Sequence, residues 1–173
     1  ADRSIIKLIN GLKFDDVTLI SISKCNYSKH LNKKIRFKNL KCNRVFFSIL
    51  KVRYFIKKEL SKNKFKKCII ISNQNFANIA TILALGNIKE IKTILIERNH
   101  LDELKNYKGF FDCLKKNLLL ILIKILYKNS NAIVGISKKL SYDLSSFIGS
   151  KVHTIYNPSL EDSIIRNNDI QKI

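Results

Sequence analysis

The sequence predicts an α/β domain built on a mostly parallel sheet. From residue 68 to residue 156, short apolar segments alternate with helical patterns of 10 to 17 residues. The apolar segments lack polar alternation, which is typical of parallel strands that are buried on both faces. A length of 173 residues with 46% apolar residues suffices for one such domain with a real core.

The first third of the chain contains two predicted helices and two predicted strands. A helix begins the chain, because Ile5, Leu8, Ile9 and Leu12 recur at helical spacing. Strands are expected over 17–22 and, around Ile35 and Phe37, over a shorter segment. The second helix spans 46–61, and its apolar face comprises Ile49, Val52, Ile56 and Leu60.

The rest of the chain predicts a regular series of strands and helices. They occupy, in order, a strand at 68–71, a helix at 75–85, a strand at 93–96, a helix at 111–127, a strand at 132–136, a helix at 138–147 and a strand at 152–156. Ser137 is the expected N-cap of the helix at 138–147, and Gly149 follows its end. This order predicts a three-layer, Rossmann-like domain.

Polar side chains follow four successive strands. The segments are Ser72–Asn75, Glu97–His100, Ser137–Lys138 and Asn157–Pro158. Ligands of open parallel sheets bind beyond the carboxyl ends of the strands, so these side chains are candidates for a site. The alternative is that strand ends simply meet polar loops, and for His100 a surface loop position is equally compatible with the sequence.

Several common motifs are missing from the sequence. It contains no G-x-G-x-x-G, no Walker A loop, no H-E-x-x-H and no G-x-S-x-G. The four Cys form no C-x-x-C pair and the three His are scattered, so no metal site is expected. We expect reduced, mostly buried thiols. The most apolar run, Leu118–Ile123, is too short to span a membrane.

Positive charge is concentrated in one sector of the chain. The net charge is +20, and residues 24–67 carry 16 Lys or Arg against one acid, Glu59. Such a sector attracts anionic lipids, nucleic acid or phosphorylated substrates. Phe46, Phe47, Tyr54 and Phe55 lie among the basic residues and are placed to reach a membrane interface or to form a core stripe. An AT-rich genome, which raises Lys everywhere, is the competing explanation.

Four segments resemble family-4 glycosyltransferases of the GT-B fold. The chain start, ADRSIIKLINGL, is similar to the first helix of that family, and Asp16–Ile20 to its second strand. The segment from Asn131 to Leu144 resembles the family pattern A-D-x-I-x-x-V-S-x-x-L-x-x-D-L. VHTIYNP, at 152–158, resembles the end of the family's N-terminal domain.

The resemblance implies an acceptor-binding N-terminal domain over 1–160 without its first strand. Residues 161–173 would begin a linker to a donor-binding domain outside this chain. Members of the family transfer a sugar from a nucleotide-sugar, with retention and without a metal or other cofactor. Many use lipid-linked or polysaccharide acceptors. The implied location is cytoplasmic, peripheral on an anionic inner membrane face, and this fragment alone is expected to be inactive.

The resemblance also implies roles for single residues. Glu97 and His100 are the catalytic candidates, because either can orient an acceptor hydroxyl. The residues expected to bind acceptor or phosphate are Arg3, Asn73, Arg98 and Asn99. Ser137, Asn157 and Pro158 match positions that line the cleft and hinge. A basic module for nucleic acid or another anionic partner, and a different Rossmann-like protein, remain alternatives.

Overall fold

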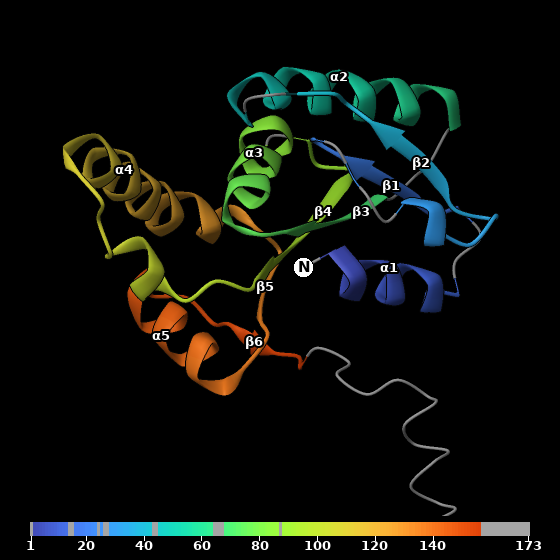
Figure 1. Ribbon diagram of the computed structural model, residues 1–173. Helices are drawn as coiled ribbons and strands as arrows, with labels where there is room; N and C mark the ends of the chain where they lie inside the picture. Colours follow the sequence, from blue (N-terminus) through green and yellow to red (C-terminus); the bar gives the residue numbers. More distant parts are fainter. Residues whose placement is uncertain are drawn as a thin grey trace, which may run out of the picture.

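The computed structural model describes residues 2–13, 16–23, 25, 28–42, 45–63, 68–86 and 88–156. The main elements in chain order (Figure 1) are α1 (Asp2–Gly11), β1 (Thr18–Ser21), β2 (Arg36–Asn39), α2 (Val45–Asn63), β3 (Cys68–Asn73), α3 (Asn75–Leu85), β4 (Ile91–Glu97), α4 (Phe110–Leu126), β5 (Ala132–Gly135), α5 (Lys138–Ile148) and β6 (His153–Thr154). Short 3-10 turns occupy Ser28–His30 (η1), Leu101–Leu104 (η2) and Tyr127–Asn129 (η3).

Every strand pair in the described residues is parallel. β1 pairs with β2 in one sheet, and β3, β4, β5 and β6 form a second sheet in that spatial order. In the four-stranded sheet, consecutive strands along the chain are neighbours, and α3, α4 and α5 are the connecting helices. The fold is therefore the predicted parallel α/β class.

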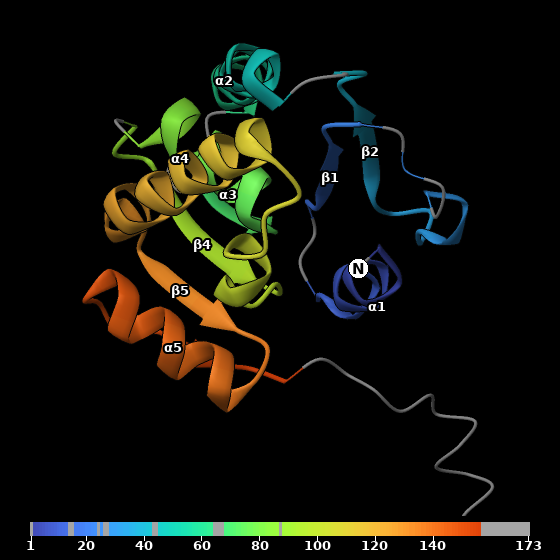
Figure 2. The ribbon, with the colours of Figure 1, turned by 60° about the vertical axis from the view of Figure 1, so that its left-hand side comes forward.

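Helices cover the strands from two sides. Figures 1 and 2 show α1 and α2 on opposite sides of β1 and β2. α2 also packs along α3, where Arg53 Nη1 donates a hydrogen bond to the carbonyl oxygen of Ala84 at 3.0 Å. The arrangement is the three-layer, Rossmann-like one that the sequence predicts.

The main core lies between the four-stranded sheet and helices α3 to α5. It joins Leu95 and Ile133 of the sheet to Ile79, Ile82, Leu119, Ile123, Leu144 and Ile148 of the helices. β5 approaches α5 closely at Gly135, because an added Cβ there would lie 2.5 Å from Ser141 Oγ and 3.1 Å from Ser141 Cα. Glycine is thus required by space at the end of β5.

A second core lies under α2. Val52 and Ile56 are buried in it, and Ile49 and Leu60 pack against it, so the predicted apolar face of this helix is confirmed. The cluster also includes Leu40 and Cys42 after β2, and Ala84, Leu85 and Ile91 from α3 and β4.

Three details differ from the predictions. Burial on both faces is wrong for β3, where Ile69 and Ile71 are 58% and 44% exposed, because the helices of the main core cover the other face of the sheet. Mostly buried thiols are also wrong, since Cys42 is buried but Cys25, Cys68 and Cys113 are only partly so. The last strand is two residues long rather than five.

Within the described ranges, no helix combines the length and the apolar character needed to cross a membrane.

Candidate functional site

The polar segments after β3, β4 and β5 meet at one edge of the four-stranded sheet. The strands are parallel, and their register pairs Asn73 with Ile96 and Glu97 with Gly135. Their carboxyl ends therefore lie side by side, which is where open parallel sheets bind ligands. We refer to Asn73, Arg98, Asn99 and His100 as the carboxyl-edge cluster.

Arg98 is the best-anchored member of the carboxyl-edge cluster. Its Nε donates a hydrogen bond to Asn73 Oδ1 at 2.7 Å, and its Nη1 donates to Ser4 Oγ at 2.5 Å. Two elements, β3 through Asn73 and α1 through Ser4, therefore hold the partly buried side chain of Arg98 at the sheet edge. A guanidinium held in this way places a fixed positive charge at the sheet edge, where it favours a phosphate or carboxylate.

Glu97 faces the interior instead. Its side chain is only 2% exposed, and its Oε2 accepts a hydrogen bond from the Tyr127 hydroxyl at 2.6 Å. Its Oε1 accepts from the backbone N–H groups of Arg98 at 2.9 Å and Asn99 at 3.2 Å. Glu97 thus fixes the backbone that carries Arg98, and it acts as a positioning residue rather than at the surface of a cleft.

Burial dominates the electrostatics of this carboxylate. It raises the pKa of Glu97, although hydrogen bonds from Tyr127, the two backbone N–H groups and Asn78 act in the opposite direction. Burial and the nearby Glu97 also raise the pKa of Tyr127 well above its ordinary value. Asn78 completes the network, because its Nδ2 donates to Tyr127 Oη and to the carbonyl oxygen of Ile96, both at 3.1 Å.

A strained backbone lies beside this network. Gln74, between β3 and α3, has φ 76° and ψ 149°, in a region that side chains other than glycine rarely adopt. Its N–H donates to the carbonyl oxygen of Ile96 at 3.0 Å and its carbonyl accepts from the N–H of Asn78 at 2.8 Å. Such strain costs on the order of 1–3 kcal/mol and clusters at functional sites.

The remaining predicted site residues are His100, Ser137, Arg3, Asn157 and Pro158. His100 is partly buried, and its carbonyl oxygen accepts a hydrogen bond from the N–H of Glu103 at 3.1 Å at the start of η2. Ser137 is the predicted N-cap: its Oγ accepts from the N–H of Leu140 at 3.2 Å. The side chain of Arg3, and Asn157 and Pro158 as a whole, lie outside the described residues.

Sequence reasoning missed Tyr127, Asn78 and Ser4 as parts of this site, and it included Gln74 in a candidate segment without predicting its strained backbone. Tyr127 is fully buried directly after the long apolar helix α4, so its hydroxyl needs a buried hydrogen-bond partner. A tyrosine at the end of such an apolar pattern was the signal that the sequence offered. The sequence gives no comparable signal for the strain at Gln74.

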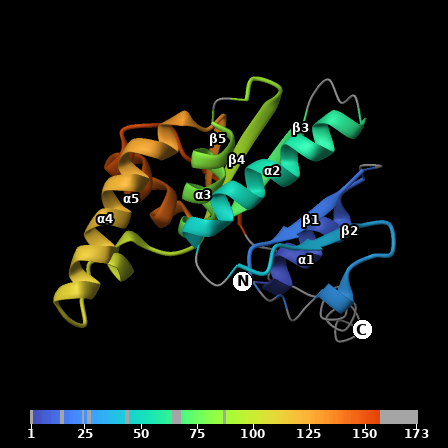
Figure 3. The ribbon, with the colours of Figure 1, turned by 90° about the horizontal axis from the view of Figure 1, so that it is seen from above.

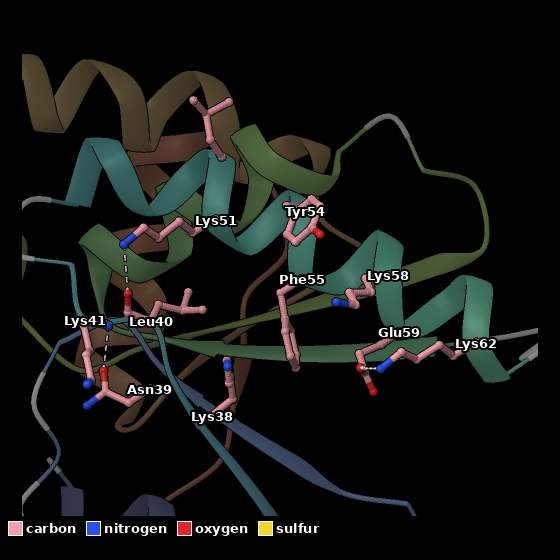
Figure 4. A pocket seen from close by; sticks show the side chains of 11 residues that line it. Lys38, Asn39, Leu40, Lys41, Lys51, Tyr54, Phe55, Lys58, Glu59 and Lys62 are labelled. Atoms are coloured by element: carbon pink, nitrogen blue, oxygen red, sulfur yellow. Dashed lines mark hydrogen bonds and ion pairs between the residues drawn. The ribbon is translucent and has the colours of Figure 1, made fainter.

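A second candidate site is a basic groove between β2 and α2, with a volume of about 860 Å³ (Figure 4). Its lining includes Lys38, Lys41, Lys51, Lys58 and Lys62. Glu59 is the acid among the lining residues, and its carboxylate already pairs with Arg36 at 2.9 Å and Lys62 at 3.6 Å. We call this surface the β2–α2 groove; its charge favours anions.

The aromatic residues of this sector divide between core and surface. Tyr54 is 68% exposed at the groove and Phe47 is 59% exposed, whereas Phe55 packs against the second core. The prediction of an aromatic core stripe is therefore wrong for Tyr54 and Phe47. Lys58 Nζ lies 5.9 Å from the centre of the Tyr54 ring, a cation–π arrangement.

Among the residues that the structure describes, no three His, Cys, Asp or Glu side chains gather closely enough to hold a metal ion. Comparison of the sequence with models of known protein families and with curated proteins gives no match. The similarity to glycosyltransferases stays a prediction from the sequence.

Proposed function

We propose that the chain is the acceptor-binding half of a retaining glycosyltransferase. In this proposal the whole protein moves a sugar from a nucleotide-sugar to a lipid-linked or polysaccharide acceptor. It works as a peripheral protein on the anionic, cytoplasmic face of the membrane. The observation that carries the proposal is the guanidinium of Arg98, which Asn73 and Ser4 hold at the carboxyl edge of a parallel sheet.

The carboxyl-edge cluster supports a division of roles. Arg98 steadies a phosphate or diphosphate group of the acceptor, because its guanidinium is a permanent positive charge that Asn73 and Ser4 fix at the sheet edge. Asn73 and Asn99 add neutral hydrogen-bonding groups. His100, which is partly exposed, orients the acceptor hydroxyl or takes up its proton. The nucleotide-sugar is held mainly by a second domain of the whole protein, so this chain alone binds it weakly.

Calorimetry on this chain tests the proposal. Geranyl diphosphate serves as a soluble analogue of a lipid-linked diphosphate, and UDP-glucose as a nucleotide-sugar. We expect the diphosphate to bind, and Arg98→Lys to weaken it roughly tenfold, because one charge remains but the planar fork is lost. Lys105→Gln removes an exposed charge that directly follows η2, and it is the matched control.

Two results would count against this function. One is equal binding of geranyl diphosphate to the Arg98→Lys and control variants, with both folded by circular dichroism. The other is tight binding of UDP-glucose to this chain, since the donor would then not need a second domain.

A basic module for nucleic acid is the second candidate, and the β2–α2 groove favours it. Five lysines and the exposed Tyr54 ring line one surface, and single strands bind through such combinations of charge and stacking. Filter binding of a single-stranded oligonucleotide at two salt concentrations tests this candidate. A steep salt slope that Lys38→Gln and Lys58→Gln reduce would support it; weak binding that both variants leave unchanged would remove it.

A further inference from the structure

One face of α4 is exposed and almost wholly apolar. Five of its side chains, each more than half exposed, form what we call the α4 stripe: Phe111 (83%), Leu114 (62%), Leu118 (55%), Ile121 (54%) and Ile125 (59%). At 3.6 residues per turn these positions fall within about 80° of one another around the helix. They follow one another by three, four, three and four residues, so they form one continuous row along α4.

The opposite side of α4 explains why the stripe faces outward. Leu119 and Ile123 are buried in the main core and fix the orientation of the helix. Figures 1, 2 and 3 show α4 at the outside of the helical layer, on the far side of the molecule from α1, β1 and β2. The core therefore does not need the stripe, and exposed apolar rows of this size mark interaction surfaces.

Lysines border the α4 stripe on both sides. Lys115 and Lys124 are exposed and lie on opposite flanks of the row, while Lys108 and Lys128 are exposed just beyond the two ends of the helix. Asp112, the acid of α4, is engaged by Lys116 at 2.9 Å. The surface thus combines an apolar centre with a positive border, on a chain of net charge +20.

The positive border indicates which kind of partner surface could cover the α4 stripe. A second copy would bring the same positive border and the same net charge of +20 to the contact, so two stripes facing each other would gather like charges around one apolar centre. Like charges there are unfavourable. A bilayer with anionic head groups has the opposite charge and an apolar interior, and it matches both parts of the surface.

We propose that the α4 stripe is the membrane-contacting surface of this protein, and that α4 lies in the plane of an anionic bilayer with the stripe among the acyl chains. The inference deepens the peripheral membrane association of the proposed function and rests on it. It assigns the contact to α4 rather than to the aromatic residues of the basic sector. The helix is about 25 Å long, from 17 residues at about 1.5 Å each, and it lies on the bilayer without crossing it.

Tryptophan fluorescence tests this assignment, because the chain contains no Trp. Leu118→Trp places a single reporter in the α4 stripe. Tyr142→Trp, at a 74% exposed position on α5, is the matched control. Vesicles of phosphatidylglycerol and phosphatidylcholine in equal parts are compared with phosphatidylcholine alone. We expect the Leu118→Trp emission to shift to the blue and to be quenched by brominated acyl chains on the anionic vesicles only, with no change for Tyr142→Trp.

Binding strength gives an independent readout. Leu118→Glu removes one buried leucine from the bilayer contact and is expected to weaken vesicle partitioning at least tenfold. Lys115→Gln with Lys124→Gln should weaken it by roughly tenfold or more, because each change removes a positive charge that the anionic surface attracts. Tyr142→Glu should have no such effect. All of these positions are exposed, so the variants are expected to keep the fold.

Four results would overturn the assignment. Two concern the Leu118→Trp emission: no shift on anionic vesicles, or an equal shift on neutral vesicles. The third is a blue shift that occurs only in a Tyr54→Trp variant, whose reporter lies on α2. The fourth is a stable dimer in sedimentation equilibrium that Leu118→Glu dissociates. The vesicle experiments and the geranyl diphosphate experiments can fail independently of each other. Vesicle binding through α4 together with unchanged geranyl diphosphate binding in Arg98→Lys would defeat only the transferase proposal.

Discussion

The hydroxyl of Tyr127 lies 2.6 Å from Oε2 of Glu97, and both side chains are almost completely shielded from solvent. Tyr127 follows α4 and Glu97 ends β4, so this contact joins the helical layer to the sheet at the edge where the polar loops meet. The other carboxylate oxygen holds the backbone of Arg98 and Asn99. The position of Arg98 therefore depends on a tyrosine that does not reach the surface.

Removal of the Tyr127 hydroxyl should destabilise the fold. Tyr127→Phe takes a donor from a buried carboxylate and an acceptor from Asn78. We expect the free energy of unfolding to fall by about 2 kcal/mol, the usual range for a hydrogen bond to a charged group. Urea denaturation measures it. Tyr107→Phe, which removes an exposed hydrogen bond to Asn117, is the control and should cost less than about 0.5 kcal/mol; equal losses in the two variants would contradict the prediction.

The Glu97 carboxyl should make stability depend on pH. Burial raises its pKa in the folded state above the ordinary value of 4.5. Between those two values the folded protein binds more protons than the unfolded chain, so this group's contribution to stability falls as the pH rises. Glu97→Gln has no such titration. The free energy of unfolding of Glu97→Gln relative to wild type should therefore rise from pH 4 upward and level off above the raised pKa. Parallel pH profiles for the two proteins would argue against this.

Two variants of Ser137 distinguish its role as a helix cap from a role in binding ligand. Ser137→Ala removes the acceptor for the N–H of Leu140 and should cost about 1 kcal/mol of stability. Ser137→Asn keeps a capping acceptor and should retain near wild-type stability. Thermal unfolding of the two variants checks the cap. A loss of geranyl diphosphate binding in Ser137→Asn, with stability intact, would show that the hydroxyl also contacts ligand.

Gly135 should not tolerate a side chain. The added methyl of Gly135→Ala would lie 2.5 Å from Ser141 Oγ and 3.1 Å from the backbone nitrogen of Ser141. We expect a loss of about 1–3 kcal/mol from overpacking between β5 and α5. Adding Ser141→Ala removes the closest contact and should restore part of the lost stability. If the double variant is no more stable than Gly135→Ala, the clash lies with the backbone of α5 instead. Differential scanning calorimetry of the single and double variants decides this.

The periodic elements could be predicted because their patterns are local. The helix at 75–85 has the predicted bounds, and the cap at Ser137 and the left-handed Gly149 after α5 follow directly from residue type. The exposure of Ile69 and Ile71 could not be predicted, because an apolar strand has the same sequence whether one face or both are covered. The lengths of strands depend on their neighbours, so β3 and β4 are longer than predicted and β6 is shorter.

The candidate site was predictable in position but not in detail. Parallel strands with polar ends predict a shared edge, and Asn73 and Arg98 do meet there. The sequence does not show which way Glu97 turns, because that depends on Tyr127, 30 residues further along the chain. The strain at Gln74 arises from the tight connection between β3 and α3, and no residue type in the sequence predicts it.

The bonds of α1 have a consequence for the order of folding. At one end of the helix, Asn10 exchanges hydrogen bonds with the carbonyl oxygen of His30 and the N–H of Asn32; at the other, Ser4 receives Arg98 across 94 positions of the chain. The contact with Arg98 can form only after β4 is in place, because a free chain closes so long a loop at a large entropic cost. We therefore expect α1 to make this contact with Arg98 late in folding. Its amide protons should exchange with solvent sooner than those of α3, which is packed between the sheet and two other helices.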